Sequence, residues 1–373
     1  MARIIYALSG QGRGHTSRVM AISDELRRRG HEVFFCCGGT AQEILEAQGE
    51  RVLPVPVLCH VMQDNVLQHG RTLRKNWEAI RTLPEIVTRP ADAFARYHPA
   101  LLITDFEGFS PRAARRIGLP VLSFNHQQVV TETRYALPLR SWLHALLSRR
   151  AINMIVPKKP AHLLLSSFFF PPLKNPSRTT LVPPIIRPSV QALRPEKGDH
   201  VLVYYNQPEG SNYVLDRLRQ VDARFIVYNF DPPEPPEAYP NLTFKQPSLD
   251  GFWDDLARSR AVVCTAGFTL ISEALYLGKP LLVVPNQGIF EQTLNALFLQ
   301  REHLGHAVID RPLRVPDVAS FLNQLNGYTE RLRNRPTSGN KEAVVCIEGV
   351  LSRHEPSVHT RPRLPFQPVA TAS

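Results

Sequence analysis

Short apolar runs alternate with amphipathic stretches along the first third of the chain. Residues 3–8 are apolar, a glycine-rich segment follows at 9–15, and residues 17–29 carry apolar positions at helical spacing. This order is typical of a strand, a tight loop and a helix. The same alternation predicts further strands and helices, the strands at 31–37, 100–104 and 120–124 and the helices at 40–48 and 110–117. Strands and helices that alternate in this way favour a parallel, doubly wound sheet.

Residues 60–98 read as mostly helical, and a proline-rich passage after residue 150 precedes a second alternating region. Its predicted strands are 200–205, 224–228, 261–265 and 280–285, and its predicted helices are 249–259, 268–277 and 291–300. We therefore predict an α/β protein with two Rossmann-like domains, residues 1–186 and 187–353, facing each other across a cleft at the carboxyl ends of their strands. The proline-rich segment 354–373 is expected to be a disordered tail.

Composition fits a globular protein, and nothing at the amino terminus argues for export. The amino terminus has too short an apolar run for a signal peptide, and no later run reaches the ~18 residues of a membrane span. The five cysteines are odd in number and lack paired zinc spacing. This usage favours a reducing, cytoplasmic location, with Cys36 and Cys264 as packing residues of strands.

The net positive charge of the chain is confined to its first half. The chain has 44 Lys and Arg against 33 Asp and Glu, and residues 1–186 hold 24 of the basic and 13 of the acidic residues, which leaves 20 of each in the remainder. A basic face of this kind attracts anionic lipid, a phosphate-bearing acceptor or nucleic acid through its summed field. Ordinary solvated surface charge is the alternative.

The most specific pattern lies in residues 264–295. An apolar strand ends at Thr265, Gly267 follows, and a helix begins with Phe268 and Thr269. The start of a helix presents free backbone N–H groups and the positive end of the helix dipole, which favour a bound anion. Because a glycine allows close backbone approach and the threonine hydroxyls add donors, we expect a diphosphate at this turn.

Four polar side chains follow at positions that suit a sugar nucleotide. Glu273 lies in the second turn of the predicted helix, where a carboxylate accepts hydrogen bonds from ribose hydroxyls, as in dinucleotide-binding folds. Glu291 and Gln292 open the next helix and offer an acceptor and a mixed amide to sugar hydroxyls. Asn295 follows one turn later.

This segment resembles the inverting GT-B glycosyltransferases, which include the enzyme that adds N-acetylglucosamine in peptidoglycan lipid synthesis and the glucuronosyltransferase-like and antibiotic glycosyltransferases. The shared positions are Gly267, Glu273, Ala274, Gly278, Pro280, Pro285, Glu291, Gln292, Asn295, Ala296 and Gly305. The resemblance implies a pyrophosphate at residues 267–269 and a ribose at Glu273. It also implies a donor sugar at Glu291 and Gln292, with UDP as the expected nucleotide and no further cofactor.

The chain departs from this family pattern at two positions. Many plant and antibiotic members have a histidine two residues before the glycine, where this chain has Thr265, and the more common acidic-amide pair is Asp-Gln rather than Glu291-Gln292. Retaining GT-B enzymes have a Glu-x7-Glu motif, whose first position is Thr265 here, so inversion is favoured. Sugar transfer by this route requires no metal, because the helix dipole and backbone donors can hold the leaving diphosphate.

The glycine-rich loop of residues 10–14 is by itself a weak signal that nicotinamide or flavin sites share. It also resembles the amino-terminal loop of the GT-B enzymes, in which a histidine follows the glycines. We predict that Gly14 lines the site and that His15 is the base that deprotonates an acceptor hydroxyl. Asp105 ends a neighbouring strand and matches the orienting aspartate of glucuronosyltransferase-like relatives, which would hold the second ring nitrogen of His15.

Residues 134–174 mix basic pairs with apolar and aromatic side chains. Trp142, Leu143, Leu146 and Leu147 share one helical face near arginines, as in a helix that lies on anionic lipid. Membrane-docking GT-B enzymes place a hydrophobic and basic patch in the same domain. We therefore expect peripheral contact with the inner face of the membrane and an anionic or lipid-linked acceptor, with a core-facing helix and a soluble acceptor as alternatives.

Two other functions fit parts of the sequence. A nucleotide-sugar 2-epimerase shares this fold and donor class but needs further carboxylates that cannot be assigned here. A non-catalytic membrane or nucleic-acid binding protein would explain the charge of +11. Nucleic acid is not expected as a partner, since no aromatic and basic recognition motif stands out.

Overall fold

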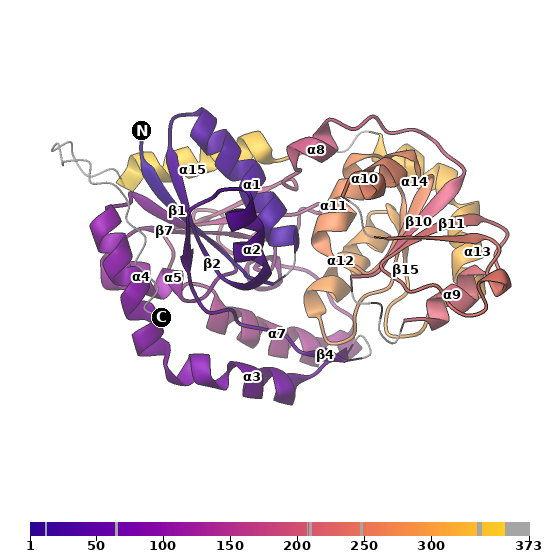
Figure 1. Cartoon of the computed structure of the whole chain (residues 1–373), viewed down its shortest axis with the longest axis horizontal. Helices are drawn as coiled ribbons and strands as arrows, with labels where there is room; N and C mark the ends of the chain where they lie inside the picture. Colours follow the sequence, from indigo (N-terminus) through magenta and orange to yellow (C-terminus); the bar gives the residue numbers. More distant parts are fainter. Residues whose placement is uncertain are drawn as a thin grey trace. The chain divides into compact units, whose positions relative to one another are not determined.

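The computed structural model describes residues 1–11, 13–63, 66–206, 208, 211–246, 249–333 and 338–354. Its contacts divide the chain into two compact units (Figure 1). The first comprises Met1–Cys59, Gly70–Arg187 and the segment from Gly339 onward, and the second comprises His60–His69 and Pro188–Ser338. Gly12 of the predicted glycine loop and residues 355–373 of the predicted tail lie outside the described residues.

The first unit is a seven-stranded parallel sheet in the order β3-β2-β1-β6-β7-β8-β9. The strands are β1 (Arg3–Leu8), β2 (Glu32–Cys37), β3 (Val52–Pro54), β6 (Leu101–Asp105), β7 (Val121–Asn125), β8 (His162–Ser166) and β9 (Thr179–Val182). The helices are α1 (Arg13–Arg28), α2 (Gly39–Ala47), α3 (His69–Arg81), α4 (Leu83–Tyr97), α5 (Ser110–Arg116), α6 (Val129–Glu132), α7 (Trp142–Ile155) and α15 (Asn340–His354), with a 3-10 turn at Leu139–Ser141.

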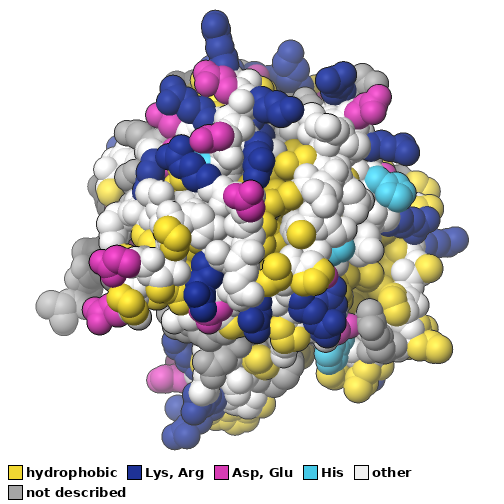
Figure 2. All heavy atoms as spheres, turned by 90° about the vertical axis from the view of Figure 1, so that its right-hand side faces the viewer, with side chains coloured by type: hydrophobic (Ala, Val, Ile, Leu, Met, Phe, Trp, Pro, Cys, Tyr) yellow, Lys and Arg dark blue, Asp and Glu magenta, His cyan; other side chains and the backbone are white. Residues whose placement is uncertain are grey.

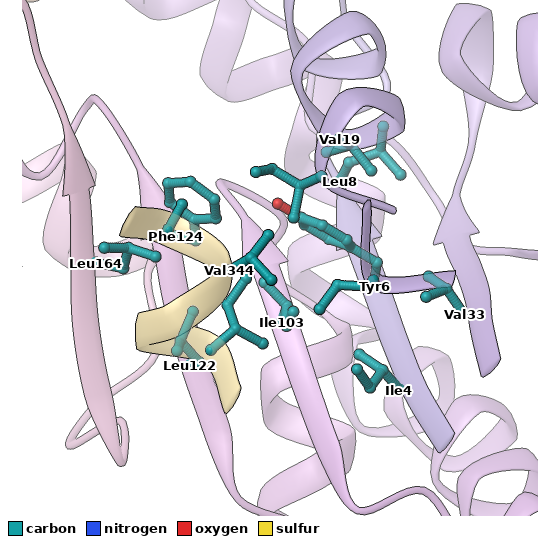
Figure 3. Packing of buried hydrophobic residues seen from close by; sticks show 14 of the residues in the cluster. Ile4, Tyr6, Leu8, Val19, Val33, Ile103, Leu122, Phe124, Leu164 and Val344 are labelled. Atoms are coloured by element: carbon teal, nitrogen blue, oxygen red, sulfur yellow. The ribbon is translucent and has the colours of Figure 1, made fainter. Parts of the chain in front are cut away.

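Apolar side chains on both faces of this sheet explain the three-layer packing. Alternate residues of β1 point to opposite faces, so that Tyr6 packs with α1 and α15 while Ile5 packs with α4 and α5. The long helix α1 contacts α15. Figure 3 shows Val344 of α15 among the side chains of β6 and β7, next to Ile103.

The second unit repeats this plan with a six-stranded parallel sheet in the order β12-β11-β10-β13-β14-β15. The strands are β10 (His200–Tyr204), β11 (Arg224–Tyr228), β12 (Leu242–Lys245), β13 (Ala261–Cys264), β14 (Leu281–Val283) and β15 (Gly305–Ala307). The helices are α8 (Pro188–Gln191), α9 (Tyr213–Leu218), α10 (Leu249–Arg258), α11 (Phe268–Tyr276), α12 (Phe290–Arg301), α13 (Val315–Asn323) and α14 (Leu325–Leu332), with a 3-10 turn at Pro236–Ala238. A two-stranded antiparallel hairpin of β4 (Met62–Gln63) and β5 (Val66–Leu67) belongs to the same unit.

Basic and acidic side chains occur together on the face shown in Figure 2, among apolar and neutral ones.

The units differ from the predicted domains at two places. Helix α15 (Asn340–His354) packs in the first unit because Val344, Ile347 and Val350 are buried against its sheet, whereas we predicted that 187–353 form one domain. Strands β4 and β5 belong to the second unit, whereas we predicted that residues 1–186 form one domain. Helices α3 and α4 agree with the prediction that residues 60–98 are mostly helical.

Two short strands were also missed in the proline-rich passage after residue 150. Strands β8 and β9 have five and four residues, and they extend the first sheet beyond β7. The predicted strand residues Cys36 and Cys264 are buried free thiols, as expected.

Candidate active site

The candidate catalytic residues of the first unit meet where the strand order of its sheet reverses. Strand β1 pairs with β2 on one side and with β6 on the other, and ligands of open α/β sheets bind at the carboxyl ends of strands at such a point. His15 lies in the first turn of α1, the helix that follows β1, and Asp105 is the last residue of β6. The backbone register pairs Leu8, the last residue of β1, with Asp105. The carboxyl ends of β1 and β6 therefore lie side by side, and the side chains of His15 and Asp105 come together there.

His15 and Asp105 are within hydrogen-bond distance. The Nδ1 atom of His15 lies 3.1 Å from Oδ1 of Asp105, and their side chains are 15% and 0% exposed. The structure therefore brings together the two residues that we predicted as base and orienting carboxylate. Gly14 precedes His15 in α1, and its carbonyl accepts a hydrogen bond from the Ser17 hydroxyl at 3.1 Å.

Arg18 is a third member of this cluster that we did not predict. Its Nε lies 3.0 Å from Oδ2 of Asp105, and its Nη2 lies 2.7 Å from both carboxylate oxygens. The same Nη2 lies 3.0 Å from Nδ1 of His15. The spacing of three residues between His15 and Arg18 places both on one helix face, and this was the signal available in the sequence.

Electrostatics around Asp105 favour its charged form. Complete burial alone would raise the pKa of this carboxyl, but the positive charge of Arg18 and the contact with His15 outweigh burial, so the pKa is lowered. The neighbouring Tyr6 hydroxyl is buried, and burial with the nearby Asp105 charge raises its pKa. Within the described residues the Tyr6 hydroxyl has no hydrogen-bond partner.

Glu107, two residues after the end of β6, caps the start of α5 with its carboxylate. Its two oxygens accept hydrogen bonds from the backbone N–H groups of Phe109 (2.6 Å) and Ser110 (2.7 Å) at the start of α5. Asp105 is thereby left to Arg18 and His15.

The predicted diphosphate turn lies at the corresponding position of the second sheet. Strand β10 pairs with β11 and β13, and the chain leaves β13 at Thr265. The Thr265 hydroxyl donates to the Oδ1 of Asn206, which follows β10, at 3.2 Å. Asn206 is a second residue that we did not predict, although it lies two residues after the end of the central strand β10.

Gly267 is the N-cap residue of α11, and no side chain caps the helix start. Its φ of −70° and ψ of 132° are open to any residue, and a Cβ atom built on it would meet nothing within 4 Å. The chain itself therefore does not require glycine here, and the space beside the turn is open. Phe268 is buried, and Thr269 is half-buried in the first turn of α11.

The remaining predicted donor residues differ in exposure. Glu273 is 2% exposed in the second turn of α11, and Asn295 is fully buried. The Asn295 amide donates to the Ala266 carbonyl at 3.1 Å and so supports the backbone that leads into Gly267. Glu291 is half-buried in the first turn of α12.

Gln292 fixes the loop that precedes it. Its Oε1 accepts the backbone N–H of Asn286 at 2.9 Å, and both side chains are buried. The Nδ2 of Asn286 is buried and has no hydrogen-bond partner among the described residues. The side chain of Gln292 thus has a structural contact in addition to its predicted sugar contact.

The β4–β5 hairpin contacts the same loop. Val66 forms a parallel bridge with Gln287, and the Leu67 N–H donates to the Gln287 carbonyl at 3.1 Å. Gly288 has φ +82°, and a Cβ atom added to it would lie 3.0 Å from that of Leu67. No local sequence signal marks this contact, because the two segments are far apart along the chain.

The basic and apolar segment 134–174 does not form one surface. Strand β8 lies between β7 and β9, and Phe168 and Phe169 are buried, so the run from Leu163 to Phe169 belongs to the core. Helix α7, in contrast, exposes apolar side chains. They are Trp142, Leu143, Leu146, Leu147 and Met154.

Among the described residues, no group of three or more His, Cys, Asp or Glu side chains is placed to hold a metal ion. No described helix combines the length and apolar content needed to cross a bilayer.

Comparison with known proteins agrees with this architecture. Similar solved structures include Acinetobacter baumannii MurG (TM-score 0.64, 14% identity, 94% of this chain and 100% of that one) and the glycotransferase of kitacinnamycin (TM-score 0.68, 18% identity, 94% and 99%). The calicheamicin glycosyltransferase CalG4 is similar to the same degree (TM-score 0.66, 18% identity, 95% and 100%). The two parallel-sheet units therefore have the GT-B fold.

The sequence comparisons define the family. An uncharacterized glycosyltransferase of Methanosarcina mazei is 22% identical over 326 residues, covering 81% of this chain and 84% of its own length. Another from Methanosarcina acetivorans is 25% identical over 320 residues, covering 80% and 81%. The profile of Glycosyl transferase family 1 matches residues 2–326, so the chain belongs to this family and is a glycosyltransferase of the GT-B type.

Proposed function

We propose that this glycosyltransferase moves a sugar from a nucleoside-diphosphate sugar, with UDP as the expected nucleotide, to an acceptor hydroxyl with inversion. The acceptor oxygen attacks the anomeric carbon while the nucleoside diphosphate leaves, and His15 accepts the hydroxyl proton at Nε2. The observation that carries the proposal is the 3.1 Å contact between His15 and the buried Asp105 at the switch point of the sheet. A histidine held by a carboxylate is the arrangement that a general base requires.

The donor is proposed to bind at the second sheet. The first-turn N–H groups at Gly267, Phe268 and Thr269 would receive the diphosphate, since the space beside Gly267 is open and no side chain caps this helix. The Thr265 hydroxyl borders the same turn. These groups would also stabilise the negative charge of the leaving diphosphate, so the proposal needs no metal.

The ribose and sugar contacts complete the proposed donor site. Glu273 would accept from the ribose hydroxyls, and Glu291 with Gln292 would bind the sugar. Asn295 would act through the Ala266 carbonyl rather than by contact, because it is fully buried.

The acceptor side is proposed to rest on anionic lipid at the inner face of the membrane. Exposed apolar residues lie at three or four positions' spacing along α7, and Trp142 is 62% exposed. Helix α3 adds Leu73, Trp77 and Ile80, also exposed on one helical face, beside exposed basic residues. Helices with an apolar face flanked by Lys and Arg bind at lipid interfaces, which would suit a lipid-linked or anionic acceptor.

A thermal-shift panel of UDP-, dTDP- and GDP-sugars tests the donor. A ligand that binds only the folded state raises the melting temperature, and we expect the UDP-sugars to do so. Glu273→Gln should abolish the shift, whereas Glu330→Gln, which changes an exposed carboxylate of α14, should leave it intact. A panel in which no nucleotide sugar stabilises the protein would refute the proposal.

Turnover with the donor identified in this way tests the chemistry. His15→Ala should reduce the rate by about 10²–10⁴-fold while the UDP-induced shift remains, because His15 is proposed to act on the acceptor. We expect turnover to persist in EDTA and the product to have the opposite anomeric configuration by NMR. Retention of configuration would contradict the displacement mechanism.

A further inference from the structure

Three cationic side chains lie close together around the end of α6, and we call them the basic cluster. Nε of Arg149 in α7 donates to the Val130 carbonyl at 3.1 Å, and Nζ of Lys174 donates to the carbonyl of the next residue, Thr131. The charges of Arg149 and Arg134 both lower the pKa of the Lys174 ammonium, after the larger effect of burial. The fold therefore holds three positive charges together although they repel one another.

The described residues supply little negative charge to the basic cluster. Within them, none of its three side chains forms an ion pair with a carboxylate. Glu132 raises the pKa of Lys174, but by less than Arg149 lowers it. An arginine has five N–H donors and a lysine three, so a single backbone carbonyl does not occupy either side chain. The basic cluster thus keeps both positive charge and hydrogen-bond donors for an anion.

A stacking contact fixes the guanidinium of Arg149. Its central carbon lies 5.4 Å from the centroid of the Tyr135 ring. The Tyr135 hydroxyl donates to the Val130 carbonyl at 2.7 Å, so one carbonyl anchors both side chains. A planar guanidinium held in this way presents its donors in a fixed direction, which suits the paired oxygens of a phosphate.

The apolar face of α7 favours a lipid phosphate over a soluble one. Trp142 and Leu146 precede Arg149 by seven and three residues, so the three share one helix face. Their exposed fractions are 62% for Trp142 and 40% for Leu146. A soluble phosphate would gain nothing from these side chains, whereas a lipid offers its phosphate to the cations and its acyl chains to the apolar groups.

We propose that the basic cluster is a binding site for the phosphate of an anionic lipid. Arg149 donates two N–H groups to phosphate oxygens, Lys174 adds a second charged donor, and the exposed Arg134 adds charge at the edge. The inference rests on the membrane contact in the proposed function and deepens it. It assigns the headgroup to three residues rather than to the summed charge of the basic half of the chain.

Sedimentation of the full chain with phosphatidylglycerol and phosphatidylcholine vesicles tests the site. Arg149→Gln and Lys174→Gln each remove one charge and retain a side-chain donor, and each should lower the partition coefficient by roughly tenfold. Arg115→Gln removes one charge from an exposed arginine of α5 and should leave the coefficient near its wild-type value. Equal losses in the three variants would show that the summed charge alone binds lipid and would overturn the site.

A fourth variant keeps the test decisive if the first two do not fold. Arg134 is exposed, and within the described residues its side chain forms no hydrogen bond or ion pair, so Arg134→Gln should fold as the wild type does. Its partition coefficient should fall about fivefold, the effect of one basic residue at an anionic surface. A coefficient that equals that of Arg115→Gln would contradict the inference.

Inorganic phosphate distinguishes a lipid phosphate from a soluble one. It should release no more wild-type protein from the vesicles than chloride does at equal ionic strength. A greater release by phosphate would show that the basic cluster takes a soluble anion, and the lipid assignment would be wrong. Nucleotide-sugar binding is a separate readout. Lipid binding that depends on Arg149 in a protein without nucleotide-sugar binding would refute the proposed transfer reaction and leave the lipid site intact.

Discussion

Arg18 binds Asp105 through two nitrogens, and neither residue has appreciable contact with solvent. The Nε–Oδ2 distance is 3.0 Å and the Nη2–Oδ1 distance is 2.7 Å. A buried pair of this kind is weak evidence of net stabilisation, but loss of one partner leaves the other charge buried and uncompensated. Loss of either partner should therefore affect both the stability of the first unit and the position of the candidate base, His15.

Asp105→Asn should lower both activity and stability. The variant keeps the shape of the side chain but leaves the Arg18 charge uncompensated, which costs about 3 kcal/mol of unfolding free energy. It also removes the charge that favours a protonated His15 during proton transfer, so we expect kcat to fall by about 10²–10⁴-fold. Urea unfolding and single-turnover kinetics measure the two effects. Wild-type kcat in the variant would show that Asp105 has no part in the reaction.

The stabilisation from Asp105 should depend on pH in a defined direction. Its pKa is lowered in the folded protein, so below about pH 4 the unfolded chain binds the proton more readily than the folded chain does. The contribution of the charged carboxylate is complete above that pH and is lost as the pH falls through the folded pKa. The difference in unfolding free energy between wild type and Asp105→Asn should hence be constant near neutral pH and narrow in acid. A difference that widens on acidification would contradict this sign.

Much of the site was predictable because it depends on short-range patterns. Strands 3–8 and 100–104 were evident from apolar runs, and residues that directly follow adjacent parallel strands must meet at one sheet edge. This placement, together with the resemblance of the glycine loop and of Asp105 to GT-B enzymes, is why His15 and Asp105 could be paired in advance. Arg18 was missed although it shares a helix face with His15, because an arginine in an amphipathic helix has many ordinary roles.

Other features could not be predicted, because they depend on long-range packing. The apolar face of α15 indicates burial but does not indicate which sheet buries it, and the structure places it on the first unit. The contact of Leu67 with Gln287 depends on chain segments that no local pattern connects. Strands as short as β9 are equally hard to recognise between prolines.

Gly288→Ala should weaken donor binding, with Gly278→Ala as a matched control. Both glycines have positive φ, +82° and +69°, so each alanine should cost about 1–2 kcal/mol of stability. Only at Gly288 does the new methyl group also meet Leu67, at 3.0 Å, in the loop held by Gln292. We expect the dissociation constant for the UDP-sugar to rise several-fold in Gly288→Ala alone, by isothermal titration calorimetry. Equal effects of both variants would show that the hairpin contact does not influence the donor site.

Trp142→Glu should reduce binding to anionic vesicles. The indole is 62% exposed on α7, and transfer of a large apolar side chain into lipid contributes about 1.5–3 kcal/mol, so the replacement should weaken the partition coefficient by roughly tenfold or more. Ile117→Glu is a suitable control, because it makes the same change at an exposed apolar residue that follows α5. Sedimentation with vesicles of phosphatidylglycerol and phosphatidylcholine measures both variants. The binding should also weaken with added salt, since screening reduces the attraction between basic side chains and anionic lipid. If the wild type does not sediment with these vesicles, or if both variants bind as it does, the exposed face of α7 has another role and the acceptor must be sought among soluble molecules.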